Sequence, residues 1–305
     1  MITVYKLFIV VAVAGALIGA GAVVTARLAA NHEPTISETK NTGSLPVLYF
    51  SQTNWQNGQR LASQAATAPW PTVHISGSII PHDILHMEYA FDVIQHLAKQ
   101  NISTVVIIGP NHYERGAVNV LTADVTWTTP KGTVSQDSTT IKKLIKLYGI
   151  QSDPTVVQGD HSVTGILPVI AQYLPNVKII PLILKAETSM EQIASLARGL
   201  HDILPANSVM IASVDFSHYL TGGQAAANDL ITAKTLQVCD STAIMSHGTS
   251  FNDFVDSPGS IALFLESMKA VGSTNSTILA NTNSGYLINS QVAPVTSYFE
   301  MVYYK

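Results

Sequence analysis

The sequence predicts a single α/β domain in which a central mixed or parallel sheet is flanked by helices. Three observations support this fold class. Short runs of β-branched and other small apolar residues alternate with helical segments, as in βαβ units. Histidine-bearing turns directly follow two of these runs, as expected at the carboxyl edge of a sheet. Without its N-terminal region the chain retains roughly 235–260 residues, which is enough for one large core.

The N-terminal region is expected to be a membrane anchor. Residues 7–24 form an uncharged apolar stretch that lies between Lys6 and Arg27. At about 1.5 Å per residue, such a helix reaches about 27 Å and just crosses the core of a bilayer. We therefore expect a transmembrane anchor over residues 1–27, with a signal peptide cleaved near Ala26 as the alternative. The domain is accordingly expected outside the cytoplasm, either membrane-anchored by a single pass or secreted.

Residues 28–45 are polar and lack periodicity, so they are expected to be a linker, and the α/β domain is expected to span residues 46–305. The domain begins with an apolar strand, an amphipathic helix and a β-branched strand, expected at residues 72–80, 83–100 and 104–108. The helix is predicted from apolar residues near helical spacing, namely Met87, Phe91, Ile94 and Leu97.

Strands and helices continue to alternate toward the C-terminus. Three helices are predicted to stop at a glycine or proline, namely 139–148 before Gly149, 163–173 before Pro175 and 190–204 before Pro205. Apolar runs predict further strands at 177–184, 208–213 and 296–303. Two more helices are expected at 225–238 and 261–271.

Composition excludes some functions. The net charge is −4 and no basic run is longer than Lys142-Lys143, so nucleic-acid binding has no electrostatic support. Cys239 is the only cysteine, which excludes an intrachain disulfide and a cysteine-based zinc site.

Histidines supply the candidate site. His82 follows the first predicted strand, His112 lies in the turn after the second, and His218 follows the strand at 208–213. Imidazoles that meet at one sheet edge can hold a metal or transfer protons. The alternative for each is a turn histidine that bonds only to backbone. His86 can share a helix face with His82, but that spacing is a weak signal, and His86 is expected to pack.

Neighbouring residues extend the site. His161 is expected near a helix N-terminus, where the helix dipole lowers the imidazole pKa and favours a neutral base. Asp215 lies three residues before His218 and can orient that imidazole. Ser217 suggests a serine hydrolase, but the sequence contains no Gly-x-Ser-x-Gly turn, so this class is not favoured. Asp256 precedes a predicted helix and, by sequence alone, is better explained as part of an N-cap turn.

Six segments in this order resemble the Memo family, specifically the bacterial and archaeal branch called AmmeMemoRadiSam system protein B. The resemblance runs from about residue 72 to the C-terminus. It rests on PH at 81–82, GPNH at 109–112, DHS at 160–162 with LP at 167–168, IPLIL at 180–184, SVDFSHY at 213–219 and TSY at 296–298.

The resemblance implies the fold of the class III extradiol ring-cleaving dioxygenases, which use non-haem Fe(II). It also implies a metal held by two histidines and a cysteine. The family's two histidines match His82 and His112, its Asp-Phe-x-His segment carries Asp215 and His218, and its His-Ser motif matches His161. The resemblance further suggests a radical-SAM system partner.

The family's cysteine is missing from this chain. Alignment of residues 259–263 with the family's helix start places Asp256 near the cysteine position, and a slip of one residue would place Ser257 there. Cys239 falls too early to be a substitute. With Asp256, the set becomes two histidines and one carboxylate, the geometry typical of non-haem Fe(II) oxygenases. Fe(II) is therefore the favoured metal, with Mn, Zn or Cu as alternatives.

The sequence thus predicts a metal-dependent, dioxygenase-like protein. His82, His112 and Asp256 would hold the divalent metal, His218 oriented by Asp215 would act as general acid or base, and the third histidine, His161, would line the pocket. Two alternatives stay open: a non-catalytic module that binds a peptide or small molecule in the same cleft, and a metal-handling redox protein.

Overall fold

The computed structural model describes residues 43–247, 254–286 and 289–305. In this part of the chain, strands form one mixed sheet with the order β1-β5-β6-β8-β3-β9-β2-β12-β10, and β11 pairs with β12. The strands are β1 (Leu45–Pro46), β2 (Ile75–Ile80), β3 (Thr104–Pro110), β4 (Val120–Thr122), β5 (Trp127–Thr129), β6 (Gly132–Gln136), β7 (Gln151–Ser152), β8 (Lys178–Leu184), β9 (Ser208–Ser213), β10 (His218–Leu220), β11 (Asn275–Asn283) and β12 (Val295–Tyr304).

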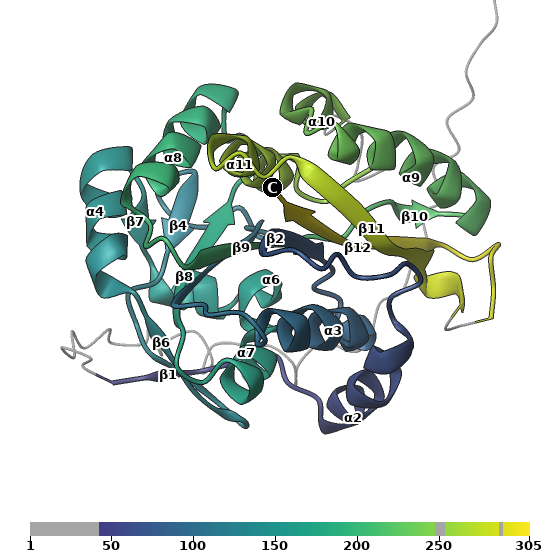
Figure 1. Ribbon diagram of the computed structural model, residues 1–305, viewed down its shortest axis with the longest axis horizontal. Coiled ribbons are helices and arrows are strands. Elements are labelled where there is room, and N and C mark those ends of the chain that lie inside the picture. Colours follow the sequence, from purple (N-terminus) through teal and green to yellow (C-terminus); the bar gives the residue numbers. More distant parts are fainter. Residues whose placement is uncertain (1–42, 248–253, 287–288) are drawn as a thin grey trace, which may run out of the picture. The chain divides into compact units, whose positions relative to one another are not determined.

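Helices cover both faces of the sheet (Figure 1). The α-helices are α2 (Gln52–Leu61), α3 (Met87–Leu97), α4 (Ser138–Tyr148), α5 (Pro154–Gln158), α6 (His161–Thr164), α7 (Leu167–Tyr173), α8 (Met190–Ile203), α9 (Gly222–Gln237), α10 (Ser241–His247) and α11 (Pro258–Ala270). Short 3₁₀ turns are η1 (Ala62–Gln64), η2 (Ile84–His86) and η3 (Ser284–Tyr286).

The centre of the sheet is parallel. Strands β8, β3, β9 and β2 pair in parallel with continuous register, for example Val106 with Ile180 and with Met210. All seven residues of β3 are buried because helices cover both of its faces. Alternate side chains enter opposite cores, with Ile107 packing on the side of α3 and α7 and Ile108 on the side of α8 and α11.

The C-terminal strand makes the sheet mixed. Strand β12 is antiparallel to β2, to β11 and to β10. Its position beside β2 brings residues from the two ends of the domain together, for example Met301 opposite Ile79.

Most predicted elements are present, with ends shifted by a few residues. The predicted helix at 83–100 begins with η2 and becomes α-helical at Met87. The predicted helix at 163–173 is two helices, α6 and α7, because the chain turns at Gly165 and Ile166, and Pro168 lies in the first turn of the second helix. The sequence analysis did not predict α2, α5, α10, β1, β4 to β7, β10 or β11.

The predicted fold class included a transmembrane helix, and this part of it is wrong for the residues that the structure describes. None of their helices is long and apolar enough to cross a membrane. The longest, α9, has 16 residues, whereas a bilayer core needs about 20. The fold is therefore a single α/β domain with a mixed sheet flanked by helices. The expected anchor at residues 1–27 lies outside the described residues.

Candidate metal centre

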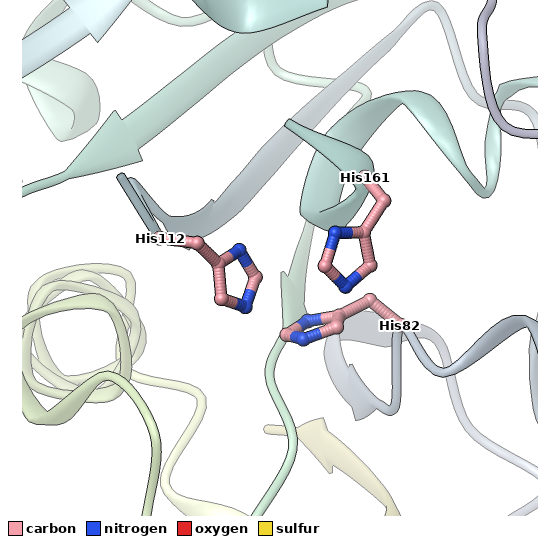
Figure 2. Close-up of side chains that lie close together, drawn as sticks. All are labelled: His82, His112 and His161. Atoms are coloured by element: carbon pink, nitrogen blue, oxygen red, sulfur yellow. The ribbon is translucent and has the colours of Figure 1, made fainter. Parts of the chain in front are cut away.

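The carboxyl ends of two parallel strands and the start of a helix bring three of the predicted histidines together. Strand β9 lies between β2 and β3, so the turns that follow these strands share one edge of the sheet. His82 follows β2, and His112 follows β3. His161 begins α6, which contacts β3. All three imidazoles face a common space (Figure 2).

A glycine allows α6 to approach this edge. A Cβ atom at Gly109 would lie 2.7 Å from the Oγ of Ser162 and 3.2 Å from the carbonyl oxygen of Ser213. The Ser162 hydroxyl donates a hydrogen bond of 2.9 Å to the carbonyl oxygen of Pro110. Close packing at residue 109 therefore places His161 beside His112.

The three histidines have metal-ligand spacing. Their candidate ligand nitrogens all lie within 4.8 Å of one another. The His82 ring is 4.9 Å from each of the other two rings between centroids, and His112 and His161 stack at 4.5 Å with 15° between their planes. These three side chains can hold a metal ion.

Hydrogen bonds orient two of the imidazoles. The Nδ1 atom of His82 lies 2.9 Å from the carbonyl oxygen of Ser213, which can only accept, so Nδ1 carries the hydrogen. The Nδ1 atom of His112 lies 2.9 Å from Oδ1 of Asp160, whose Oδ2 accepts the backbone N–H of His112. In their neutral forms, both rings therefore present the lone pair of Nε2 to the shared space. Carbonyl or carboxylate partners of this kind fix metal-binding histidines in many proteins.

Asp256 faces both lone pairs. Its Oδ2 lies 3.2 Å from Nε2 of His82 and 3.7 Å from Nε2 of His112, and its side chain is 3% exposed. Neither oxygen of Asp256 has a hydrogen bond of normal geometry. A carboxylate opposite two imidazole lone pairs is an arrangement of acceptors, so it requires protons or a metal cation between them. The donor set fits a divalent metal.

The pKa values reflect this convergence of charge. Burial favours the neutral form of His82, but Asp215 and Asp256 outweigh it and raise the pKa of His82 to about 10. Burial also opposes the charge on His112, yet the hydrogen-bonded carboxylate of Asp160 and the nearby carboxylate of Asp256 raise its pKa to about 9. Burial would raise the pKa of Asp256, but the two histidines hold it well below its usual range.

His161 behaves differently from its neighbours. Burial, followed by the positive charges of His82 and His112, lowers its pKa to about 4. His161 is therefore a neutral imidazole at neutral pH, and its ring stacks on that of His112, a prospective ligand.

Asp160 has two roles beside these histidines. It caps α6 by accepting the backbone N–H of Ser162, and the same carboxylate holds His112.

The segment before α11 places Asp256. Its backbone N–H donates to the carbonyl oxygen of Asp215, and Val255 forms a β-bridge with Phe216. Ser257 is the N-cap of α11, with its Oγ accepting the N–H of Ser260. Asp256 therefore faces the histidines, whereas the neighbouring serine caps the helix.

Asp215 contacts a different histidine from the one that the sequence suggested. Its Oδ1 accepts the backbone N–H of His82, and its Oδ2 lies 3.6 Å from Nε2 of that residue. His218 is partly exposed at the start of β10, and its Nδ1 contacts the carbonyl oxygen of Phe216. The structure shows no hydrogen bond or ion pair between Asp215 and His218 among the contacts of the described residues.

Sequence reasoning missed two supports of the site. Asp160 was recognised only as the first residue of the DHS segment that carries His161, and not as the partner of His112. Asp229, on α9, is buried and accepts hydrogen bonds from Ser217, Ser297 and Asn281 at 3.0, 2.7 and 2.8 Å. It thereby ties the segment that carries Asp215 to β11 and β12. No local sequence signal marks Asp229.

Comparisons with known proteins agree with this architecture. The sequence model described as Memo-like protein matches residues 58–302. A MEMO1 family protein of Methanopyrus kandleri is 27% identical over 205 residues, covering 66% of this chain and 72% of that protein. A MEMO1 family protein of Pyrobaculum arsenaticum is 25% identical over 243 residues, covering 77% and 86%. An uncharacterised protein of Escherichia coli K12 has a similar fold, with a TM-score of 0.50 and 12% identity over 74% of this chain and 99% of its own.

Proposed function

The chain belongs to the Memo-like protein family, and on that premise we propose that it is a mononuclear metal protein with dioxygenase-like chemistry. His82, His112 and Asp256 would hold one divalent metal, with Fe(II) favoured. The observation that carries this proposal is the buried Asp256 carboxylate, which faces Nε2 of both imidazoles without a hydrogen bond of normal geometry.

The donor set favours hard or intermediate metals. Two imidazoles and a carboxylate suit Fe(II), Mn(II) and Zn(II), whereas thiolate ligands favour Cu(I). The single thiol, Cys239, is buried beside α9 and does not belong to the group that converges at the centre. A bound Fe(II) would supply a Lewis acid and a one-electron redox centre.

His161 offers a neutral imidazole beside the centre. Its candidate ligand nitrogen lies within 4.8 Å of those of His82 and His112. We assign it the role of a base toward an acidic hydroxyl of a bound substrate. Asp160 and the carbonyl group of Ser213 keep the neighbouring imidazoles in one tautomer. His218 lies at the partly exposed rim, where it can exchange protons with solvent or substrate.

Metal content of the purified full-length protein, loaded with Fe(II) without oxygen, tests the proposal. We expect about one metal ion per chain in the wild type. His112→Ala and Asp256→Ala should lose it, while the exposed control His201→Ala should keep it. An empty wild type, or metal retained in both site variants, would contradict the metal centre.

Oxygen consumption tests the enzymatic half separately. The Fe(II)-loaded protein should consume O₂ when a catechol-like substrate is added, and His161→Ala should slow this more than it weakens metal binding. Metal binding with ligand binding but no turnover would instead support a binding module.

A further inference from the structure

A cleft of about 550 Å³ lies at the edge of the sheet opposite the metal centre, where the parallel strands β2 and β9 begin. The C-terminal ends of α8 and α11 form its sides, and Lys305 lies beside the end of α11 (Figure 1). Its volume falls within the range of small-ligand pockets, which is roughly 300–1,000 Å³. None of the proposed metal ligands lines this amino-edge cleft, so it is separate from the metal centre.

The walls and the bottom of the amino-edge cleft are apolar. Leu204 and Val271 are partly buried residues of the walls, and Val73 is 49% exposed at the rim. Met210 and Met268 lie deeper and are almost fully buried. Thioether side chains are flexible and adapt to irregular apolar groups. An apolar group that leaves water for this cleft therefore gains free energy in proportion to the area that it buries.

Basic side chains lie around this apolar surface. Three basic residues line the cleft, namely His74, His201 and Lys305, whereas no aspartate or glutamate lines it. All three are exposed, and their side chains have no hydrogen bond or ion pair within the part of the chain that the structure describes. Their N–H groups are therefore available to an anionic group that enters the cleft.

Hydrogen bonds within the lining add a donor and satisfy acceptors. The hydroxyl of Ser273 donates to Oγ of Ser76 at 2.7 Å, so the hydrogen of Ser76 is left for an acceptor in the cleft. Gly272 ends α11 in a left-handed conformation, with φ of +71°. The backbone N–H groups of Gly272 and the next residue donate to carbonyl oxygens of the last helical turn, which would otherwise disfavour an anion. The lining thus favours a ligand group that accepts hydrogen bonds.

We propose that the amino-edge cleft binds an amphipathic carboxylate, a molecule with an apolar tail and one anionic head. The tail lies against Leu204, Val271 and Met210, and the head accepts hydrogen bonds from Lys305 and His201. An amine would bring a second positive charge to the head position, and an alcohol would lack the charge-assisted hydrogen bonds. The proposed metal centre takes no part in this binding, so the two proposals can fail separately.

Titration of the full-length protein with octanoate tests the site, with ¹³C-labelled methionine methyl groups observed by NMR. Octan-1-ol and octylammonium have the same alkyl chain with no charge and with the opposite charge. We expect saturable binding of octanoate that shifts the resonances of Met210 and Met268, and binding of the other two that is weaker by about fivefold or more. Met87 lines the small cleft beside His82 and reports binding near the metal centre instead. Equal binding of octanoate and octylammonium, or shifts confined to Met87, overturns the proposal.

The length of the alkyl chain tests the apolar half of the site. Affinity should rise by about twofold to fourfold for each methylene added between hexanoate and decanoate, because each added group leaves water. Acetate, which has the head alone, should not saturate at concentrations at which octanoate does. Equal affinities for acetate and octanoate would reduce the site to a weak surface attraction for anions and overturn the proposal.

Variants locate the binding. Leu204→Trp fills the cleft and should abolish octanoate binding, whereas Leu147→Trp, an exposed change on α4, should not alter it. The double change Lys305→Gln and His201→Gln should weaken octanoate binding by about fivefold and leave octan-1-ol binding unchanged. Lys143→Gln is the exposed control for the loss of charge. Because the double change affects only exposed side chains, it tests the site even if Leu204→Trp does not fold. Unchanged octanoate binding in the double variant overturns the proposal.

Discussion

Asp256 and Glu300 are both buried carboxyl groups that lack hydrogen bonds of normal geometry, yet they carry different charges. Burial disfavours ionisation of each. At Asp256, two imidazoles outweigh burial and keep the group an anion. At Glu300, Asp92 and Glu88 act in the same direction as burial and keep it protonated at neutral pH. The neighbours, rather than burial itself, decide which carboxyl can bind a metal.

The largest expected effect comes from removing the charge of Asp256. Asp256→Asn keeps the shape of the side chain but cannot supply an anionic ligand, so we expect metal affinity to fall by about 100-fold or more. Anaerobic metal titration measures this. Glu300→Gln is the matched change at the other carboxyl and should leave metal affinity unchanged. Similar metal affinities for the two variants would contradict the assignment of Asp256, rather than Glu300, as the metal-binding carboxylate.

A smaller loss is expected when the support of a ligand is changed. Asp160→Asn weakens the acceptor on Nδ1 of His112, and such changes typically cost about 10–100-fold in metal affinity. Asp153→Asn is the control, because Asp153 caps α5 in the same way but belongs to no histidine pair of the centre. The same titration compares the two. If both variants bind metal equally well, Asp160 is only a helix cap.

Glu300→Gln should change how stability depends on pH. Between the ordinary pKa of 4.5 and the folded value of about 10, the unfolded chain has released this proton while the folded chain still holds it. Rising pH therefore removes stability over that window, by up to about 1.4 kcal/mol per pH unit. The variant should remove this slope and be more stable than the wild type at pH 8.

Chemical denaturation at pH 5, 6.5 and 8 measures this difference, with Glu191→Gln as an exposed control. If wild type and Glu300→Gln lose stability in parallel as the pH rises, Glu300 is ionised in the fold.

The smallest effect is expected at a buried carboxylate of a third kind. Asp229 accepts hydrogen bonds from three side chains, and burial nevertheless raises its pKa. Ser297→Ala removes one of the donors and should lower the free energy of unfolding by about 1 kcal/mol. Ser246→Ala, on the exposed side of α10, should have almost no effect. Equal unfolding midpoints for the two variants would show that the other donors compensate.

The main strands and helices of the fold could be predicted from the sequence because the patterns that indicate them are local. Apolar runs fixed the buried strands β3, β8 and β9 to within two residues, since both faces of each lie in a core. Strands of two or three residues, such as β4 and β7, are too short to show a period of alternating residues. They form because β4 pairs through its backbone with both β8 and β7. Strand β11 carries mostly small polar residues, so only its pairing with β12 reveals it.

The site was predictable in its residues and less so in its contacts. Strand-end histidines and the resemblance pointed to His82, His112 and Asp256, which the structure brings together. The partner of Asp215 was not predictable from the sequence. Proximity along the chain favoured His218, whereas in the fold Asp215 accepts a hydrogen bond from the backbone N–H of His82. Glu300 interrupts an apolar strand, which indicates that its charge is neutralised in the fold. The neighbours that keep it protonated, Asp92 and Glu88, lie on α3 and could not be identified from the sequence of the strand.

The pairing of β12 with β2 has a consequence for folding. His82 and His112 are synthesised long before Asp256. Strand β12 is synthesised last, and its Ser297 accepts a hydrogen bond from the backbone N–H of Phe216. No short stretch of this chain contains all three prospective ligands, so the complete ligand set forms only when distant segments of the chain have met. Contacts so distant in sequence form slowly and together. Metal acquisition would then report that folding is finished, and a bound ion would stabilise only the completed fold.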